Sequence, residues 1–366
     1  MKKIFYVEPD STYFISNRLE LACSMLNDGY EVHVATMLFS NEDKQVIESK
    51  GIVCHFPTGE NQSMKCICKK IKKVSPNIIH VCNLSACAKL GLSLLGYKRS
   101  NIVFSITGLG YAYTSNSLFA KMIRIMLKFL IPALNAKHDM KFIFQNEDNK
   151  KEFVGIHKLK ENQIFLIMGS GVNLEKFSPF ATNNEIPKVL FAGRLLKDKG
   201  IYEYIEAAKI IHERNISAIF MIAGTLDKKN PNSLSESELT AIKKIPFVEY
   251  NGYVKNMNVL FREVNIACLP SSYGEGLSKF LIEAGASGKP IVTTDVPGCR
   301  EVVENGKNGF VVPAKDAKAL SEAIATLCLD KEKRESMGKE SRRVIEEHFA
   351  MGIVVKKIKD VYKKFC

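Results

Sequence analysis

Short apolar runs alternate with longer segments of helical period along the first half of the chain. An apolar run at 3–7 precedes a helical segment at 18–27, and a second apolar run follows at 31–36. This succession predicts a strand, a helix and a parallel strand, with Gly29 at the end of the helix. Further apolar runs, each short enough for a buried parallel strand, lie at 78–82, 103–107, 142–144 and 164–167. The first half therefore predicts a doubly wound α/β sheet.

A second α/β series begins after a break in this periodicity. Turn residues accumulate over 171–187, which we interpret as a linker between a domain at 1–170 and a domain at 188–350. Beyond the break, strands are predicted at 189–192, 218–222, 248–250, 266–269, 291–294 and 310–312. Helices are predicted at 202–214, 278–287, 317–329, 331–348 and 354–365. The sequence therefore predicts two parallel-sheet domains, and such folds bind ligands at the carboxyl ends of their strands.

Composition narrows the class of protein. The 366 residues are 46% hydrophobic and 25% charged, which is typical of a soluble globular chain with room for two domains. Acidic and polar residues follow the first apolar run directly, so we expect no signal peptide. Lys121, Arg124 and Lys128 interrupt the most apolar segment, so we expect no membrane span. Ten cysteines are scattered along the chain, which favours reduced thiols and a cytoplasmic location.

Positive charge is concentrated in one region. The net charge is +13, and no acidic residue occurs between Glu60 and Asp139. Within this region Lys121, Arg124 and Lys128 recur at helical spacing among apolar residues, as in a helix that lies in an anionic membrane interface. A helix packed on the sheet with a cationic outer edge is the alternative. A nucleic-acid-binding module would also be basic, but we find no aromatic stacking platform or known motif, so we expect no nucleic acid partner.

Two loops carry the candidate chemistry, and both lie in the second half. In the first, Gly193 follows a predicted strand and permits a sharp turn, so that Arg194 and Lys199 stand at the strand's carboxyl end. Two cations there suit a diphosphate, because an arginine fork and a lysine ammonium both bind phosphate oxygens. A basic connection with surface charges alone is the alternative.

The second loop runs from Pro270 through a glycine-rich turn into a helix. Such a turn presents backbone N–H groups and the positive end of the helix, which bind anions. Glu275 in the loop is placed to meet sugar hydroxyls, and Glu283 in the first two helical turns to accept hydrogen bonds from a ribose. For Glu283 the alternative is an exposed helix residue, because burial of an unsatisfied glutamate is costly.

Two missing motifs exclude other chemistries. A dinucleotide-dependent dehydrogenase would carry G-x-G-x-x-G after its first strand, where residues 8–13 read EPDSTY. No two aspartates are two residues apart, so the chain has no D-x-D pair for a cation. We therefore expect no metal and no other cofactor, with the charge of the leaving group neutralised by Arg194, Lys199 and backbone dipoles.

These loops resemble the signature of glycosyltransferase family four. The resemblance rests on Glu275 and Glu283 in an E-G-x-x-x-x-x-x-E pattern, on GKPIVTTD at 288–295, on PGCRE at 297–301 and on NGFV at 308–311. It implies the α/β GT-B fold, in which two Rossmann-like domains face each other across a cleft and a C-terminal helix, here within 351–366, returns to the N-terminal domain. It also implies a retaining enzyme that transfers a sugar from a nucleotide sugar.

The same resemblance implies roles for the site residues. Glu275, Arg194 and Lys199 would be catalytic, the first at the donor sugar and the other two at the diphosphate, while Glu283 would contact the ribose. A further set would line the donor: Gly193, Gly274, Gly276, Leu277 and Tyr253. The histidine that relatives carry in the cleft after the fifth strand is missing from this sequence. Its nearest substitutes in the N-terminal domain are Ser11, Thr12, Gly108 and Gly110.

Two segments narrow the resemblance further. The sequences TGLGY at 107–111 and DKKNP at 227–231 are similar to a bacterial subgroup that extends undecaprenyl-diphosphate-linked sugars in O-antigen, capsule or protein-glycan assembly. The implied donors are mostly UDP-sugars, with hexoses and N-acetylhexosamines common. The implied acceptor is a lipid-linked saccharide, which places the protein at the inner face of the cell membrane. A sugar-nucleotide epimerase of the same architecture is the alternative enzyme, and it would need acid and base residues in the cleft but no acceptor.

Overall fold

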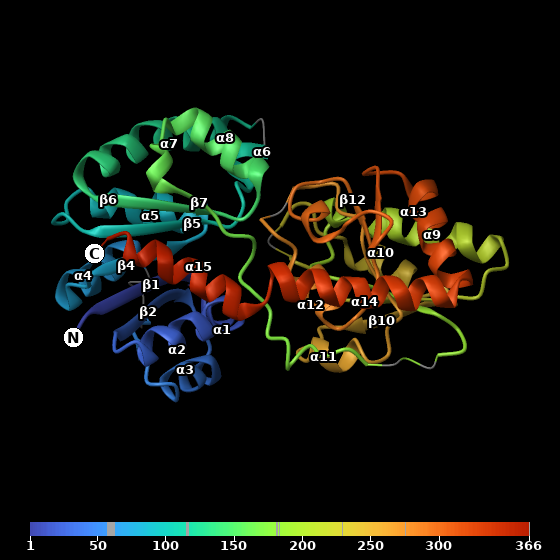
Figure 1. Ribbon diagram of the computed structural model, residues 1–366. Coiled ribbons are helices and arrows are strands. Elements are labelled where there is room, and N and C mark those ends of the chain that lie inside the picture. Colours follow the sequence, from blue (N-terminus) through green and yellow to red (C-terminus); the bar gives the residue numbers. More distant parts are fainter. Residues whose placement is uncertain are drawn as a thin grey trace. The chain divides into compact units, whose positions relative to one another are not determined.

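The structure is a computed structural model that describes residues 1–56, 63–114, 117–180, 182, 184–228, 230–274 and 276–365. The chain forms two compact units (Figure 1). Unit 1 consists of Met1–Gly171 together with Met351–Cys366, and unit 2 consists of Val172–Ala350. Each unit is an α/β layer structure built on its own parallel sheet.

Over the residues that are described, the sheet of unit 1 has seven strands in the order β3-β2-β1-β4-β5-β6-β7. They are β1 (Lys3–Asp10), β2 (Glu31–Leu38), β3 (Val53–Cys54), β4 (Ile78–Cys82), β5 (Asn101–Ile106), β6 (Asp139–Phe144) and β7 (Ile164–Leu166). All neighbouring strands pair in parallel. The strand order reverses between β1 and β4, which makes this position the topological switch point of the sheet.

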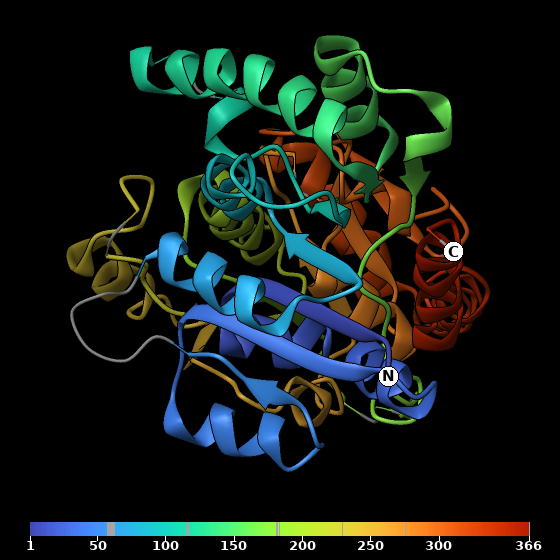
Figure 2. The same cartoon turned by 90° about the vertical axis from the view of Figure 1, so that its left-hand side faces the viewer.

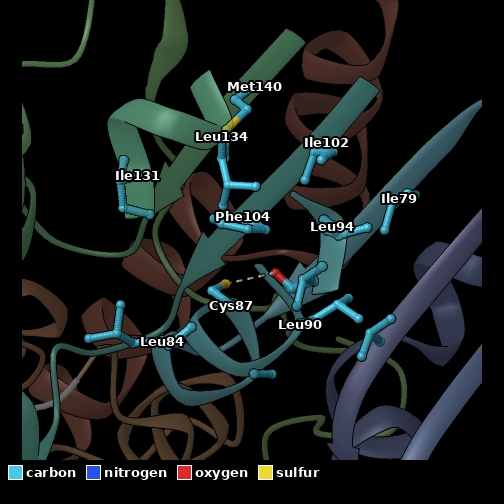
Figure 3. Packing of buried hydrophobic residues seen from close by; sticks show 14 of the residues in the cluster. Ile79, Leu84, Cys87, Leu90, Leu94, Ile102, Phe104, Ile131, Leu134 and Met140 are labelled. Carbon is cyan, nitrogen blue, oxygen red and sulfur yellow. Dashed lines mark hydrogen bonds between the residues drawn. The ribbon is translucent and has the colours of Figure 1, made fainter. Parts of the chain in front are cut away.

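Helices cover both faces of this sheet, and each face has its own apolar core. One core contains side chains of α4 (Met64–Val74), α5 (Leu84–Leu94), α7 (Leu118–Lys137) and α8 (Glu147–His157). Figure 3 shows side chains of α5 and α7, among them Leu90 and Leu134, gathered around Phe104 of β5. The opposite core contains side chains of α1 (Ser11–Asn17), α2 (Leu19–Asn27), α3 (Asn41–Glu48) and α15 (Met351–Lys363). Two short helices complete the unit, α6 (Tyr111–Thr114) and η1 (Glu161–Gln163).

The C-terminal helix α15 belongs to unit 1, as the predicted fold class requires. It is the red helix that lies among the blue and green elements of that unit in Figure 1. Val354, Ile358 and Val361 recur at helical spacing and are buried in the core shared with α2. The hydroxyl of Tyr362 forms a hydrogen bond of 2.6 Å with Nδ1 of the buried His80 on β4. A helix from the end of the chain therefore completes the core of the first unit.

Over its described residues, unit 2 has a six-stranded parallel sheet in the order β10-β9-β8-β11-β12-β13. Its strands are β8 (Lys188–Ala192), β9 (Ile219–Ala223), β10 (Val248–Gly252), β11 (Ile266–Leu269), β12 (Ile291–Thr294) and β13 (Gly309–Val312). Its helices are α9 (Ile201–Glu213), α10 (Glu236–Ile242), α11 (Met257–Leu260), α12 (Lys279–Ala286), α13 (Ala317–Leu329) and α14 (Lys331–His348), with short 3-10 turns η2 (Lys197–Lys199) and η3 (Arg300–Val302). The strand order reverses between β8 and β11, which is the switch point of this sheet.

The predicted linker segment, 171–187, is attached to unit 2 along much of its length. Nη1 of Arg342 on α14 donates to the carbonyl oxygens of Phe177 and Ala286, each at 2.7 Å. The ammonium of Lys289 donates to the Thr182 hydroxyl at 2.8 Å. Burial lowers the pKa of Lys289 to about 8. From Val172 onward the segment belongs to unit 2, whereas Gly171 belongs to unit 1.

A buried histidine in unit 1 should make the stability of the fold depend on pH. His157 at the end of α8 is 4% exposed, its Nε2 lies 2.9 Å from the Tyr113 hydroxyl, and burial lowers its pKa to about 4. The unfolded chain binds a proton at this side chain near pH 6.5, whereas the folded chain does so only near pH 4. Stability is therefore lost as pH falls through this window.

We expect the free energy of unfolding to fall by about 2 kcal/mol from this group between roughly pH 7 and pH 5. Urea unfolding at the two pH values should show that His157→Gln loses this part of the dependence. His348→Gln, at a half-exposed position on α14, is the control. Equal pH dependence in the wild type and His157→Gln would contradict the prediction.

Candidate functional site

The candidate site of unit 2 lies at one edge of its sheet. Because all strand pairs are parallel, the carboxyl ends of the six strands share that edge. The loop after β8 holds Arg194 and Lys199, and the loop after β11 runs from Pro270 to α12. These are the two loops that flank the switch point between β8 and β11, where open α/β sheets bind ligands. The two loops chosen from the sequence are thus neighbours in space.

Contacts between the two loops are close and fixed. Asp198 supplies its carbonyl oxygen to the Ser272 N–H at 2.9 Å and to the Ser271 hydroxyl at 3.1 Å. Gly200 has φ of 77°, and a Cβ placed on it would lie 1.9 Å from the carbonyl oxygen of Pro270. Only glycine fits there, because both the conformation and the close approach exclude a side chain. Gly193, to which the sequence argument assigned this freedom, has φ of 159°, a conformation that L side chains rarely adopt, although a Cβ there would meet no atom within 4 Å.

The two predicted phosphate-binding cations differ in their surroundings. The Arg194 side chain is 61% exposed, and its Nη1 donates to Oδ2 of Asp227 at 2.9 Å. Lys199 closes the η2 turn and is half-buried. The sequence did not predict the ion pair with Asp227, which follows β9. A guanidinium has five N–H donors, so one carboxylate oxygen leaves it able to bind a further anion.

The start of α12 presents the positive end of a helix at the same edge. Ser278 is its N-cap, and the Ser278 hydroxyl accepts a hydrogen bond of 3.5 Å from the Leu281 N–H. Gly276 is buried and Gly274 and Leu277 are half-buried in the turn before the helix. The predicted catalytic residue Glu275 lies outside the described residues. The start of α12 therefore lies at the same edge of the sheet as the cationic loop after β8.

Glu283 is not the exposed helix residue that the sequence left as an alternative. Its side chain is 12% exposed and its carboxylate lies 3.7 Å from the ammonium of Lys279, one turn earlier on α12. Burial raises the pKa of Glu283, and the charges of Lys279 and Lys176 oppose that shift. A mostly buried carboxylate near two lysines is suited to accepting hydrogen bonds from hydroxyl groups.

Tyr253 stands apart from these groups in its exposure. It follows β10 at the carboxyl edge of the sheet, and its side chain is 70% exposed. The strand order places β10 at one end of the sheet, beyond β9 from the switch point. An exposed aromatic ring at this edge has a free face for stacking.

The residues predicted for the N-terminal domain also lie at the carboxyl edge of their sheet. Ser11 and Thr12 begin α1 directly after β1, and their hydroxyls donate to Oδ2 of Asp43 at 2.6 and 2.9 Å. Ser11 is 1% exposed. Gly108 and Gly110 lie in the turn after β5, and Gly110 has φ of 58°. Asp43 therefore already receives the hydroxyl hydrogens of the two proposed histidine substitutes.

A buried charged cluster at the switch point of unit 1 was missed from the sequence. Glu8 on β1 is fully buried, Arg18 is 3% exposed, and Nε of Arg18 lies 3.4 Å from both Oε1 of Glu8 and Sγ of Cys82. Besides burial, the Arg18 guanidinium and the Cys82 thiol have the largest effects on the Glu8 carboxylate. Burial raises the pKa of Glu8 to about 7, and the Arg18 charge opposes the shift. The predicted strand ended at residue 7, whereas β1 continues to Asp10, so the burial of Glu8 was not predicted.

Helix α7 carries an apolar stripe on its outer side. Its buried side chains include Leu127, Leu130, Ile131 and Leu134, which face the core. On the opposite side lie five exposed apolar side chains, between 58% and 77% exposed: Leu118, Phe119, Met122, Ile125 and Phe129. The long green helix at the top of Figure 2 is α7. Ile123 and Met126, which lie between these positions in the sequence, pack against the core, and Leu130 lies within it.

Of the three cations predicted to contact a membrane, two are exposed. Lys121 and Lys128 lie beside the apolar stripe. Arg124 instead is half-buried and donates through Nη1 to the carbonyl oxygen of Ala112 at 2.6 Å. No helix in the described parts of the chain is long and apolar enough to cross a membrane.

Comparisons with known proteins follow the division into two units. Residues 172–344 match the family described as glycosyl transferases group 1, and residues 3–146 match the family described as glycosyl transferase 4-like. The chain is 29% identical over 234 residues to the capsular polysaccharide biosynthesis glycosyltransferase CapM of Staphylococcus aureus, covering 60% of each chain. It is 34% identical over 247 residues to the N,N'-diacetylbacillosaminyl-diphospho-undecaprenol alpha-1,3-N-acetylgalactosaminyltransferase of Campylobacter jejuni, covering 64% of this chain and 63% of that one. The matches thus span somewhat less than two thirds of these relatives.

A likeness to solved structures extends over the whole chain. Anabaena Alr3699/HepE, in complex with UDP and glucose, has a TM-score of 0.80 against this chain at 15% identity, with 100% of both chains covered. Identity at this level speaks for the fold alone. The predicted fold class is confirmed: the chain has the GT-B fold of two Rossmann-like domains, and each of its two units matches a family of glycosyltransferases.

Proposed function

We propose that the protein transfers a sugar from a UDP-sugar to a polyprenyl-diphosphate-linked saccharide with retention of configuration. The observation that carries this proposal is the meeting of three anion-binding features at the switch point of unit 2: Arg194, Lys199 and the start of α12. The mostly buried carboxylate of Glu283 on the same helix would supply a partner for ribose hydroxyls. A relative named for a diphospho-undecaprenol substrate supports the acceptor class, and a neighbour solved with UDP and glucose supports the donor class.

The proposed chemistry places charge on the departing diphosphate. As the bond between the anomeric carbon and the diphosphate oxygen breaks, that oxygen gains negative charge, which Arg194 and Lys199 offset. The acceptor hydroxyl attacks the anomeric carbon from the face that the diphosphate leaves, and the hydroxyl proton passes to the departing phosphate. Backbone dipoles at the start of α12 add to the stabilisation. We expect no metal requirement, because Arg194 and Lys199 would supply the positive charge that a metal ion supplies in other transferases.

A transfer assay tests this proposal directly. The purified full chain is mixed with a series of UDP- and GDP-sugars and synthetic prenyl-diphosphate-linked saccharides, and UDP release and the extended lipid product are measured with and without EDTA. We expect UDP release that requires the lipid acceptor and is unaffected by EDTA. Interconversion of a UDP-sugar without acceptor would instead identify the epimerase alternative, which the transferase names of the relatives do not favour.

We further propose that the protein attaches peripherally to the cytoplasmic face of an anionic membrane through α7. The outer stripe of α7 offers apolar side chains for the acyl boundary, with Lys121 and Lys128 beside it for anionic headgroups. Helix α5 packs between α7 and α4, and α4 exposes five lysines on its outer side: Lys65, Lys69, Lys70, Lys72 and Lys73. Because no acidic residue occurs at 61–138, this surface has no carboxylate from these helices to repel anionic lipid. A membrane-bound enzyme would meet its lipid-linked acceptor there.

A further inference from the structure

The segment between β9 and α10 lies along the cationic loop of unit 2. The Leu195 N–H donates to the Thr225 carbonyl at 3.0 Å, and the Leu234 N–H donates back to the Leu195 carbonyl at 2.9 Å. The Lys197 N–H donates to the Asn232 carbonyl at 2.8 Å. These main-chain hydrogen bonds attach both ends of the segment 225–234 to the loop that carries Arg194 and Lys199.

Side chains and a glycine contact strengthen this attachment. The Asn232 amide donates to the Asp198 carboxylate at 2.6 Å. The backbone N–H of Asp227 donates to the Ser233 hydroxyl at 3.0 Å, which turns the segment back on itself. A Cβ on Gly224 would lie 1.8 Å from the Gly193 carbonyl oxygen. The backbone segments at Gly193 and Gly224 therefore approach each other so closely that only glycine fits at position 224. Asp227 and Arg194 therefore project from backbones that are fixed relative to each other.

We propose that Asp227 is a positioning residue that holds the Arg194 guanidinium ready for the diphosphate of the donor. This inference rests on the function proposed above. Arg194 is 61% exposed, and an arginine in solvent loses much rotamer freedom when it binds a ligand. The 2.9 Å contact from Nη1 to Asp227 fixes the side chain before the donor arrives, and pre-organised groups bind with a smaller ordering cost. The remaining donors of the planar fork bind the phosphate oxygens.

A competing interpretation makes Asp227 a placeholder that the diphosphate must displace. In that case its negative charge would weaken donor binding, and removing the charge would strengthen it. The anchored segment favours positioning, because main-chain hydrogen bonds hold both of its ends against the cationic loop and the Asp227 N–H donates to the Ser233 hydroxyl. The two interpretations predict opposite signs, which makes the question accessible to one measurement.

The experiment measures UDP binding by calorimetry, and kcat and KM for the donor, with the full chain and a fixed lipid acceptor. The variants are Asp227→Asn, Asp227→Glu, Arg194→Ala and the double variant Arg194→Ala with Asp227→Asn. We expect Asp227→Asn to weaken UDP binding roughly tenfold and Asp227→Glu to recover most of the loss. In the double variant the Asp227 change should add nothing to Arg194→Ala, because its target is absent. Glu322→Gln, which removes the 3.0 Å partner of Arg214 elsewhere on unit 2, is the matched control and should bind UDP as the wild type does.

Thermal melting separates this role from a structural one. A partly exposed ion pair contributes little to stability, so Asp227→Asn should melt within a degree or so of the wild type. Unchanged or tighter UDP binding by Asp227→Asn, or additive losses in the double variant, would overturn the inference while leaving the donor site intact. Failure of the wild type to bind UDP or any other nucleotide would instead count against the proposed function.

Discussion

Replacing Arg194 by alanine is expected to lower kcat by two orders of magnitude or more, and Lys199→Ala should have a similar effect. Both side chains belong to the loop after β8 at the switch point of unit 2. A charged group that contacts a developing negative charge contributes about 3 kcal/mol to stabilisation of the transition state, or about a hundredfold in rate. The loss should fall mainly on kcat, because the charge on the leaving oxygen is greatest in the transition state.

Steady-state kinetics with a fixed lipid acceptor and a varied UDP-sugar measure this effect. Arg194→Lys distinguishes charge from geometry, because lysine keeps the charge but loses the planar fork, and we expect it to recover part of the rate. Arg214→Ala removes a partly exposed arginine from an ion pair outside the site and should leave kcat unchanged. Near-normal kinetics in both Arg194→Ala and Lys199→Ala would rule out the assignment of this loop to the diphosphate.

The order of strands and helices along the chain could be predicted because buried parallel strands appear in the sequence as short apolar runs. The predicted runs at 78–82 and 291–294 agree closely with β4 and β12, which are buried along their whole lengths. The edge strand β3 was missed, because it has two residues and neither is buried. Helices α4 and α5 were also missed. In α4 the many lysines obscure the helical spacing of the three buried side chains, Ile67, Cys68 and Ile71.

Site residues could be predicted where they lie in a loop directly after a predicted strand. They could not be predicted where the interaction partner comes from a distant segment. Arg194 and Lys199 follow a strand within ten residues, so their place at the sheet edge could be inferred from chain order alone. Asp227 lies on another loop, and only the strand order brings it to Arg194. Glu8 on β1 and Arg18 between α1 and α2 form a buried ion pair. No local sequence pattern predicts this contact.

The orientation of α7 shows a different limit of sequence reasoning. Apolar residues occupy nearly every side of this helix, so its period does not say which side faces the sheet. The charges at Lys121, Arg124 and Lys128 suggested one cationic stripe, yet Arg124 turns inward to a carbonyl oxygen. Packing on the core selects the side containing Leu127 and Leu134 and leaves an equally apolar side outside. The exposed apolar side chains on that outer side support the proposal that α7 contacts a membrane.

Substituting two residues of the outer stripe, Met122→Glu together with Phe129→Glu, is expected to weaken binding to phosphatidylglycerol-containing vesicles by more than tenfold. The two side chains are 59% and 71% exposed and lie on the same side of α7, so the change should leave the core intact. Burying one such side chain in an apolar phase contributes about 1.5–3 kcal/mol when complete, so even partial insertion of two exceeds the 1.4 kcal/mol of a tenfold change. The glutamates also repel the anionic lipid.

Vesicle co-sedimentation at several salt concentrations measures this binding and separates its two parts. Lys121→Gln with Lys128→Gln should weaken binding by about 1 kcal/mol per lysine at low salt and lose its effect as salt screens the charges. Val259→Glu with Leu329→Glu places the same charges on exposed apolar positions of unit 2 and should bind vesicles as the wild type does. Because α7 lies in unit 1, the Met122 and Phe129 variant should keep wild-type affinity for UDP while losing turnover on acceptors embedded in vesicles. Unchanged vesicle binding by that variant would show that α7 does not contact the membrane.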